Sequence, residues 1–462
     1  MRSIITMNYK DDLKEYTNDQ NELQNESNNL IINDLDHDTE DTKLKFAFMS
    51  VMHSISTSSN PEFYYQGLMY LSRSIIDNIS VFIELMPPQF PVMLINSLKK
   101  EEFVEFQDAV FIFLCSFIDI YDDVQSIFNI QELFDLTFII LQNHNIHGIK
   151  HYLNFITQVI MKYQLVIDIK ENNEVIKKFY SDNLENIIAI NHFLIQYIRL
   201  ANNSDQIHQI YEIIINNLFS INECSTFEVL LELFSSDENL IQNYLESTHF
   251  LAFLKEFNAI NNEYNDKYVK KSIRFLLFML NYQNGKENGK NIANLINFMN
   301  LCEMFETTDS NNYFNELIEL FICILDSDPK VFLKLFIDNN IVIISIDEFI
   351  HGTYSRSVII IKLIKKLFAY IPEIMLDYLF SASFFQTNNI LSISDADSLD
   401  FCIFIFDIIN FAKTQPDKLE NIIQQLENSG FLEDLNELMD IKHDYFGEIG
   451  QEIINIANKF MN

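Results

Sequence analysis

Three stretches in the second half of the chain share one arrangement around a proline. They read Ile324-Leu-Asp-Ser-Asp-Pro-Lys-Val-Phe-Leu-Lys-Leu-Phe-Ile337, Leu367-Phe-Ala-Tyr-Ile-Pro-Glu-Ile-Met-Leu-Asp-Tyr-Leu-Phe380 and Phe411-Ala-Lys-Thr-Gln-Pro-Asp-Lys-Leu-Glu-Asn-Ile-Ile-Gln424. In each stretch an apolar helical run ends, a short break follows, and a shorter amphipathic segment begins at the proline, a residue favoured at the first position of a helix. Pro329, Pro372 and Pro416 lie 43 and 44 residues apart. This spacing predicts a structural repeat.

The surrounding sequence extends the repeat in both directions. A second break and a further predicted helix follow each proline segment, at 338–341, 381–384 and 428–431. Residues 233–242 repeat the arrangement about two periods earlier. Long helices are also predicted to start near Phe63, Phe103 and His147, again 40 and 44 residues apart.

Local patterns agree with helices separated by short polar links. Phe63, Leu68, Leu71, Ile75 and Ile76 recur at steps near 3.6 residues, which predicts one buried face. The pairs Asn60-Pro61 and Asp328-Pro329 place a capping side chain before a proline, which is typical of a helix start.

Three helices in about 40–47 residues is the period of the armadillo repeat, and two helices in that span is the period of the related HEAT unit. Over residues 43–462 the chain resembles the armadillo-repeat family, in which small residues occupy the places held here by Gly430, Gly450 and Ala457. The resemblance implies an all-α fold, an α-α superhelix or armadillo-type solenoid of about nine to ten three-helix repeats. Residues 1–42 are polar, acidic and rich in Asn, which predicts a disordered acidic N-terminal tail.

The formal net charge of −35 argues against nucleic-acid binding, because that function depends on clustered Lys and Arg. An acidic surface favours a basic protein or peptide partner, and the acidity also keeps an apolar-rich chain soluble. The five cysteines are far apart and form no CxxC pair, which suggests a reducing compartment. No signal-peptide pattern or membrane-length apolar run is present, so the expected location is cytoplasmic or nuclear.

In the armadillo family the third helix of each repeat lines a concave groove. The resemblance therefore implies a protein-binding surface on the predicted long helices, with these candidate residues: Gln66, Arg73, Gln107, His151, Asn154 and Gln158. The nuclear-import adaptors of the family carry a ladder of Trp and Asn in that groove. This chain has no Trp, so the ladder is absent.

Other patterns in the sequence contain residue types that chemical sites use. His144, His147 and His151 have a spacing that zinc could use, but the sequence favours a polar helix start, since no fourth ligand is evident. Residues 285–290 lack the spacing and the Ser or Thr of a phosphate loop, so a loop between two helices is predicted there. Two basic stripes, Lys267 to Arg274 and Lys362 to Lys366, either pair with local Asp and Glu or meet an acidic partner or a phosphate group. No catalytic signature is present, so no catalytic residue, cofactor or metal is predicted.

The sequence thus predicts a non-enzymatic scaffold that binds a protein or peptide along the groove. The alternatives are a regulatory subunit of a phosphatase, kinase or small GTPase system, and a divergent nuclear transport receptor.

Overall fold

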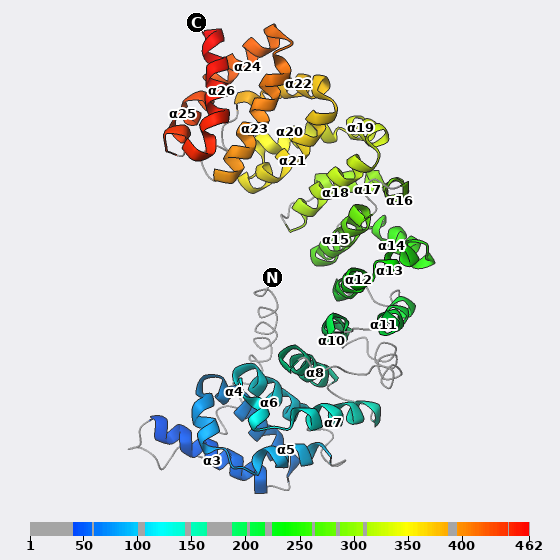
Figure 1. Cartoon of the computed structure of the whole chain (residues 1–462), viewed down its shortest axis with the longest axis vertical. Coiled ribbons are helices and arrows are strands. Elements are labelled where there is room, and N and C mark those ends of the chain that lie inside the picture. Colours follow the sequence, from blue (N-terminus) through cyan, green and yellow to red (C-terminus); the bar gives the residue numbers. More distant parts are fainter. Residues whose placement is uncertain are drawn as a thin grey trace. The chain divides into compact units, whose positions relative to one another are not determined.

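The computed structural model describes residues 40–57, 60–99, 107–143, 149–163, 187–200, 204–217, 224–260, 264–282, 287–307, 312–386, 395–441 and 443–461. Every regular element among them is a helix (Figure 1). The chain divides into two compact units, unit 1 within residues 1–175 and unit 2 within 176–462. The tail predicted for residues 1–42 lies outside the described residues, apart from the first residues of the helix that begins at Glu40.

Unit 1 contains pairs of helices. Its elements are α3 (Glu40–Thr57), α4 (Pro61–Leu85), α5 (Phe90–Leu98), α6 (Gln107–Ile120), the 3₁₀ turn η2 (Val124–Ser126), α7 (Ile130–Asn143) and α8 (Ile149–Tyr163). The long helices α4, α6 and α8 pack side by side in that order. Within the described part of this unit, two helices form each repeat, as in the HEAT variant of the period.

Unit 2 changes from two helices per repeat to three. Its first elements are α10 (Ile187–Leu200), α11 (Ser204–Asn217), α12 (Cys224–Ser236), α13 (Asn239–Leu245), α14 (Thr248–Phe257), α15 (Asp266–Tyr282), α16 (Glu287–Leu295), α17 (Phe298–Thr307) and α18 (Phe314–Ser327). The remaining elements are α19 (Pro329–Asp338), α20 (Ile341–His351), α21 (Tyr354–Tyr370), α22 (Pro372–Ser381), η6 (Phe384–Gln386), α23 (Asp395–Ala412), α24 (Pro416–Asn428), α25 (Phe431–Ile441) and α26 (His443–Met461). The three-helix unit predicted from the proline period is therefore seen from α13 onward.

The proline period is confirmed residue by residue. Helices α19, α22 and α24 begin at Pro329, Pro372 and Pro416. A long helix precedes each of them, and a second short element follows. The link before that second element contains a residue with left-handed backbone in all three copies: Asn340 (φ 58°), Ser383 (φ 58°) and Gly430 (φ 80°).

Successive long helices form one continuous row in unit 2. Contacts join α10 to α12, α12 to α15, α15 to α18, α18 to α21, α21 to α23 and α23 to α26. Each helix buries one face against its neighbours in the row, as expected of a solenoid in which a repeat touches only adjacent repeats. The opposite face of the same helices is left for polar side chains.

Phenylalanine rings fill the space between repeats. In unit 1, Phe82 lies edge-on to Phe48, Phe90, Phe113 and Phe117, with ring centroids 5.7 to 6.1 Å apart. In unit 2, Phe275 similarly contacts rings of α12, α13 and α14. The high Phe content thus serves the core, where edge-to-face pairs add about 0.5–1.5 kcal/mol each beyond their burial.

Some local predictions were wrong. Leu68, Leu71 and Ile75 are fully buried on α4, but Phe63 is 60% exposed and Ile76 52% exposed. The cap at Asn60 is confirmed, since its side chain accepts a hydrogen bond from the Glu62 amide at 3.0 Å. Asp328 makes no side-chain cap, because its carboxylate instead pairs with Lys290.

Small residues lie where helices approach closely. A Cβ added to Gly450 on α26 would come within 2.9 Å of the Met439 Cγ atom on α25, and Ala457 is fully buried. Gly67 on α4 has the same relation to Ile55 on α3, whose Cγ1 atom would be 2.7 Å away. Both glycines therefore permit the packing of neighbouring helices.

No single helix of the described residues meets the length and hydropathy expected of a membrane span. One pair, α4 and α5, passes that test jointly but bends by 112° between its members.

Candidate functional site

The first two candidate residues, Gln66 and Arg73, lie on one exposed face of α4. They are seven residues apart, which is close to two helical turns. Phe63 and Tyr70 share that face and are 60% and 39% exposed. The structure therefore places Gln66 and Arg73 at the surface beside two aromatic rings, although their role in binding a partner stays a prediction.

The third candidate, Gln107, is only 3% exposed, and its side-chain amide forms hydrogen bonds inside unit 1. Its Nε2 donates to the Leu98 carbonyl at 3.1 Å, and its Oε1 accepts from the Tyr152 hydroxyl at 2.6 Å. These bonds tie the start of α6 to α5 and α8. Gln107 thus joins three helices, and the expectation that it faces a groove is wrong.

The last three candidates, His151, Asn154 and Gln158, lie on one half-buried face of α8. Burial, assisted by the charge of Lys150, lowers the pKa of His151 to about 4, so the imidazole is neutral near pH 7. The Oε1 atom of Gln158 is buried and finds no hydrogen-bond partner among the residues that the structure describes. Lys162 on the same face donates to the carbonyls of Ile118 and Tyr121 at 2.6 and 2.7 Å, joining α8 to the end of α6.

The histidine cluster considered for zinc is represented only by His151, because His144 and His147 lie outside the described residues. Among the residues that the structure does describe, no group of three His, Cys, Asp or Glu side chains is arranged to hold a metal ion.

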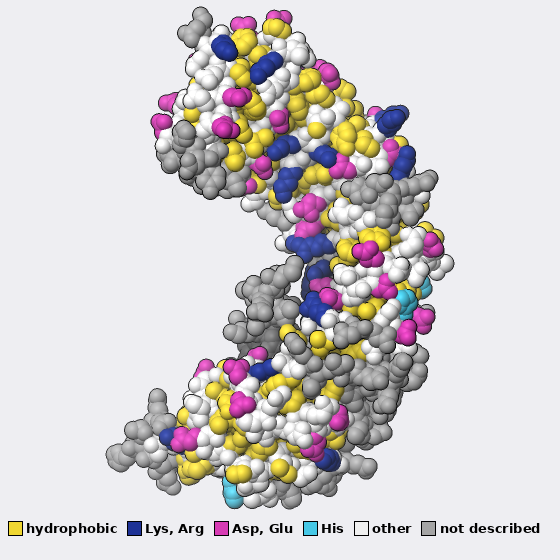
Figure 2. Space-filling model, in the orientation of Figure 1, with side chains coloured by type: hydrophobic (Ala, Val, Ile, Leu, Met, Phe, Trp, Pro, Cys, Tyr) yellow, Lys and Arg dark blue, Asp and Glu magenta, His cyan; other side chains and the backbone are white. Residues whose placement is uncertain are grey.

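The two basic stripes lie on the long-helix row of unit 2, one on α15 and the other on α21. Figure 2 shows Lys and Arg side chains gathered on this part of the unit, with Asp and Glu side chains among them. The predicted pairing with acidic residues is confirmed. The partners are nevertheless distant in sequence, since they lie on the neighbouring long helices.

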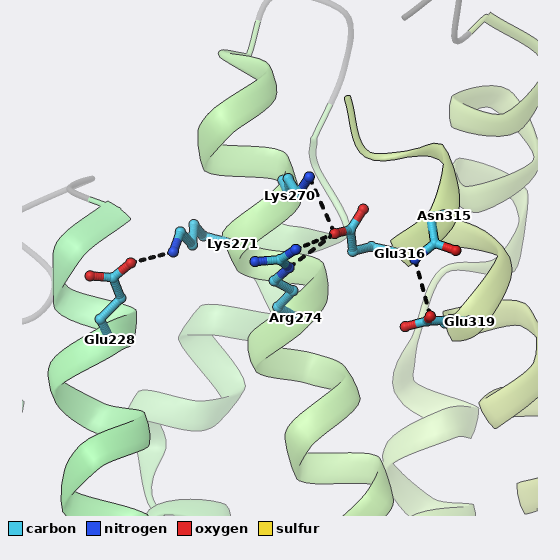
Figure 3. A network of polar contacts seen from close by, with 7 residues as sticks. All are labelled: Glu228, Lys270, Lys271, Arg274, Asn315, Glu316 and Glu319. Carbon is cyan, nitrogen blue, oxygen red and sulfur yellow. Dashed lines mark hydrogen bonds and ion pairs between the residues drawn. The ribbon is translucent and has the colours of Figure 1, made fainter. Parts of the chain in front are cut away.

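The contacts of α15 reach both neighbours (Figure 3). Lys271 points to Glu228 on α12 and forms an ion pair with it. Lys270 and Arg274 converge on Glu316 of α18, at 3.3 and 2.6 Å. The Glu316 side chain is 6% exposed, so one shielded carboxylate holds two cations of the adjacent helix. This arrangement fixes the register between α15 and α18.

The contacts of α21 follow the same scheme. Lys366 lies 2.7 Å from Asp326 of α18, and Tyr370 donates to the same carboxylate at 2.8 Å. Lys365 lies 3.4 Å from Asp400 of α23. Basic helices thus alternate with acidic ones along the row. Of the four basic residues on α15 and the three of the α21 stripe, Lys267 and Lys362 are the two whose side chains make no ion pair with a described residue.

The sequence analysis identifies the basic residues of these ion pairs but not their acidic partners. Glu228 lies 43 residues from Lys271, Glu316 lies 42 residues from Arg274 and 46 from Lys270, and Asp326 lies 40 residues from Lys366. The available signal was the recurrence of opposite charge at the repeat period. The proline spacing gives the approximate separation of these pairs, but it does not give the register that selects a particular carboxylate.

Lys290, the last residue of the stretch compared with a phosphate loop, belongs to helix α16. Its Nζ lies 2.9 Å from Asp328, and hydrogen bonding to Lys290 lowers the pKa of that carboxyl. This ion pair joins α16 to the start of α19. Because Glu287–Lys290 form the first turn of α16, the prediction of a loop between helices is wrong for these residues, while residues 283–286 lie outside the described residues.

One Ser, His and Asp constellation exists at the start of α11. Ser204 Oγ and Asp237 Oδ2 both approach the same ring nitrogen of His208, Nδ1, at 3.5 and 3.6 Å. A nucleophile relay needs the serine and the carboxylate on opposite ring nitrogens. The three residues therefore form a surface contact between α11 and the end of α12.

Four cysteines, at 115, 302, 323 and 402, are buried free thiols. Burial raises the pKa of Cys302 and Cys402 to about 12 and that of Cys323 to about 11. Thiols held in this neutral form are weak nucleophiles. These four side chains pack in the core, and the side chain of Cys224 lies outside the described residues.

No protein-family model matches the chain, and a comparison with curated proteins gives no match. Among solved structures, an engineered protein matches 89% of this chain and 99% of its own, with a TM-score of 0.56 and 13% identity. The karyopherin Kap121p, bound to the extreme C-terminus of the protein phosphatase Cdc14p, matches 91% of this chain and 46% of its own, with a TM-score of 0.47 and 11% identity. Kap121p bound to Nup53p gives a TM-score of 0.41. The chain spans about half the length of this karyopherin. The likeness to the engineered protein is one of fold, and the chain is an all-α helical-repeat solenoid.

Proposed function

We propose that this chain is a non-enzymatic protein-binding scaffold, with its partner on the exposed faces of the stacked helices. The observation that carries the proposal is the row α10 to α26. Each member of the row buries one face and presents polar and charged side chains on the other. Stacked helices of this kind offer an extended surface on which many modest contacts add together.

The charge composition of the last repeat supports a basic partner. Residues 416–461 contain ten Asp and Glu against three Lys. Glu420, Glu433 and Glu448, on α24, α25 and α26 respectively, are exposed, and their carboxylates make no hydrogen bond or ion pair within the described part of the chain. Unpaired carboxylates attract a cationic segment without first having to release an internal partner.

The test is capture of partners from lysate at low salt, using the full chain and a charge-reversed form. The variant Glu420→Lys/Glu433→Lys/Glu448→Lys should lose basic proteins that the native chain retains. The matched control Glu62→Lys/Asp77→Lys, with two exposed carboxylates of α4 changed, should keep them. Recovery of the same proteins by all three forms, or of none by the native chain, would contradict the proposal.

A further inference from the structure

The first described helix, α3, exposes large apolar side chains on the side turned away from its neighbours. The helix packs mainly on α4 and α5 and buries Phe48, Met52 and Ile55 (Figure 1). Phe46 and Met49 are three residues apart, which places them one above the other on a helix, and they are 49% and 48% exposed. In the part of the chain that the structure describes, no helix precedes α3 to continue the stack on this side.

The two ends of the described chain differ in the outer side that they present. Terminal repeats of a helical stack normally have a polar outer face, which keeps the stack soluble. The last helix, α26, agrees with this rule over most of its length, since Glu448, Glu452 and Asn455 lie along its exposed side. On α3 the exposed side carries Phe46 and Met49 instead. We therefore expect a further segment to cover α3.

The chain itself supplies an apolar segment directly before α3. The polar tail contains the run Leu30-Ile-Ile-Asn-Asp-Leu35, which lies outside the described residues. The spacing of Ile31, Ile32 and Leu35 is that of branched side chains on one side of a helical turn. Four polar residues, 36–39, separate the run from Glu40, and links of about two to five residues are usual between antiparallel helices. The sequence therefore has the pattern of a short segment that folds back on α3.

The run is close enough in sequence to reach the exposed side of α3 within one molecule. Leu35 precedes Glu40 by five residues, and an extended chain spans at most about 3.3–3.6 Å per residue, which gives a reach of about 17 Å. Because a helix rises about 1.5 Å per residue, Phe46 and Met49 lie about 9 and 14 Å along α3 from Glu40. So short a link holds the run near α3 at a local concentration in the millimolar range, far above that of a second copy in solution.

Charge favours this acidic segment over a basic partner on α3. From Thr42 to Thr57 the helix contains Lys43 and Lys45 and no acidic residue. Asp34 and Asp36 lie within and directly after the apolar run. The run therefore matches α3 in both apolar character and charge, whereas the lysines would repel a basic segment.

From these observations we propose that residues 30–35 bind back onto the exposed side of α3 in the same molecule, with Ile31 and Leu35 against Phe46 and Met49. The bound segment completes this end of the helical stack. It also occupies the apolar side of α3, so a partner can use that side only after it displaces the segment. The inference is independent of the proposed scaffold function, because it concerns only the first described helix and the residues before it.

Oxidation of methionine by dilute hydrogen peroxide tests whether the segment covers Met49. Met161 on α8 is the internal control, because the two side chains are 48% and 50% exposed when the segment is left out of consideration. In the full native chain, peptide mapping by mass spectrometry should show Met49 oxidised about fivefold more slowly than Met161, since a covered sulfur reacts slowly. In Ile31→Ser/Leu35→Ser the two rates should become equal, with the Met161 rate unchanged.

Hydrogen exchange measures the other side of the same contact. In the native chain the amides of residues 30–35 should exchange about tenfold more slowly than those of the polar residues before them. Phe46→Ser/Met49→Ser should remove this difference. The matched control Leu251→Ser/Met299→Ser, which changes two apolar side chains of unit 2 that are each 55% exposed, should keep it. All four positions are exposed, so circular dichroism should show native helix content.

Three results would overturn the proposal. The first is equal oxidation of Met49 and Met161 in the native chain, and the second is protection of residues 30–35 that persists in Phe46→Ser/Met49→Ser. The third is protection that increases with protein concentration, because a second copy would then supply the segment. If the α3 variant loses helix content, the oxidation assay decides alone, since its own variant leaves α3 unchanged. None of these results bears on the lysate capture, which changes α24 to α26.

Discussion

At the scale of single residues, Glu316 is where two cations of the neighbouring helix meet. The substitution Glu316→Ala leaves Lys270 and Arg274 close together without a counter-charge. Both cations are partly exposed and can rehydrate, so the expected loss is about 1–2 kcal/mol, below the 3–5 kcal/mol typical of fully buried pairs. Thermal unfolding should show the decrease. Glu319→Ala, one turn away and exposed, is the control and should cost no more than about 0.5 kcal/mol.

The burial of His151 makes the stability of the folded protein depend on pH. Its folded pKa is about 4, below the ordinary value near 6.5, because burial disfavours the charged ring. The unfolded chain therefore takes up the proton first, and the stability present above pH 6.5 is lost as pH falls toward 4. In urea unfolding at pH 7 and pH 5.5, His151→Gln should reduce the pH-dependent loss. His53→Gln, an exposed position on α3, should leave that loss as in the native chain, and equal behaviour of the two variants would contradict this role.

At the scale of elements, the links between the short helices of the last three repeats share one backbone conformation. Gly430 adopts a left-handed φ of 80°, and Ser383 adopts 58° at the equivalent position. An L residue pays about 1–2 kcal/mol there, whereas glycine does not. Gly430→Ala should therefore lower thermal stability by about 1 kcal/mol, while Ser383→Gly should leave it unchanged or raise it. Calorimetry of the two variants measures both signs, and a gain for Gly430→Ala would show that this φ carries no strain.

The sequence predicts where helices start better than it predicts which helices contact one another. Pro329, Pro372 and Pro416 could be placed because a helix start depends on neighbouring residues. Gln107 could not, because its burial depends on Tyr152, forty-five residues away. The partners of the α15 cations required the register between helices, which no single helix encodes. The same limit applies to Phe63. The periodicity of α4 predicts that this ring is buried, but the spacing of residues within one helix does not show whether another helix covers it.

At the scale of the whole molecule, a solenoid predicts that damage stays local. Each repeat contacts only its neighbours, so the stability of the chain is approximately a sum of repeat and interface contributions. Phe82 links α3, α4, α5 and α6 through four ring contacts. Removing the ring in Phe82→Ala should cost about 3–5 kcal/mol within those helices.

Hydrogen exchange followed by mass spectrometry distinguishes local from global loss. Phe82→Ala should accelerate exchange in α3 to α6 and leave α18 to α23 as in the native chain. Phe384→Ala, which removes a ring packed on Phe349, Phe401 and Phe404, should do the reverse. The two variants remove the same group from different units, so each serves as the control for the other. Uniform acceleration along the chain in both variants would mean that the helices unfold as one cooperative body, and the additive description of the repeats would then have to be abandoned.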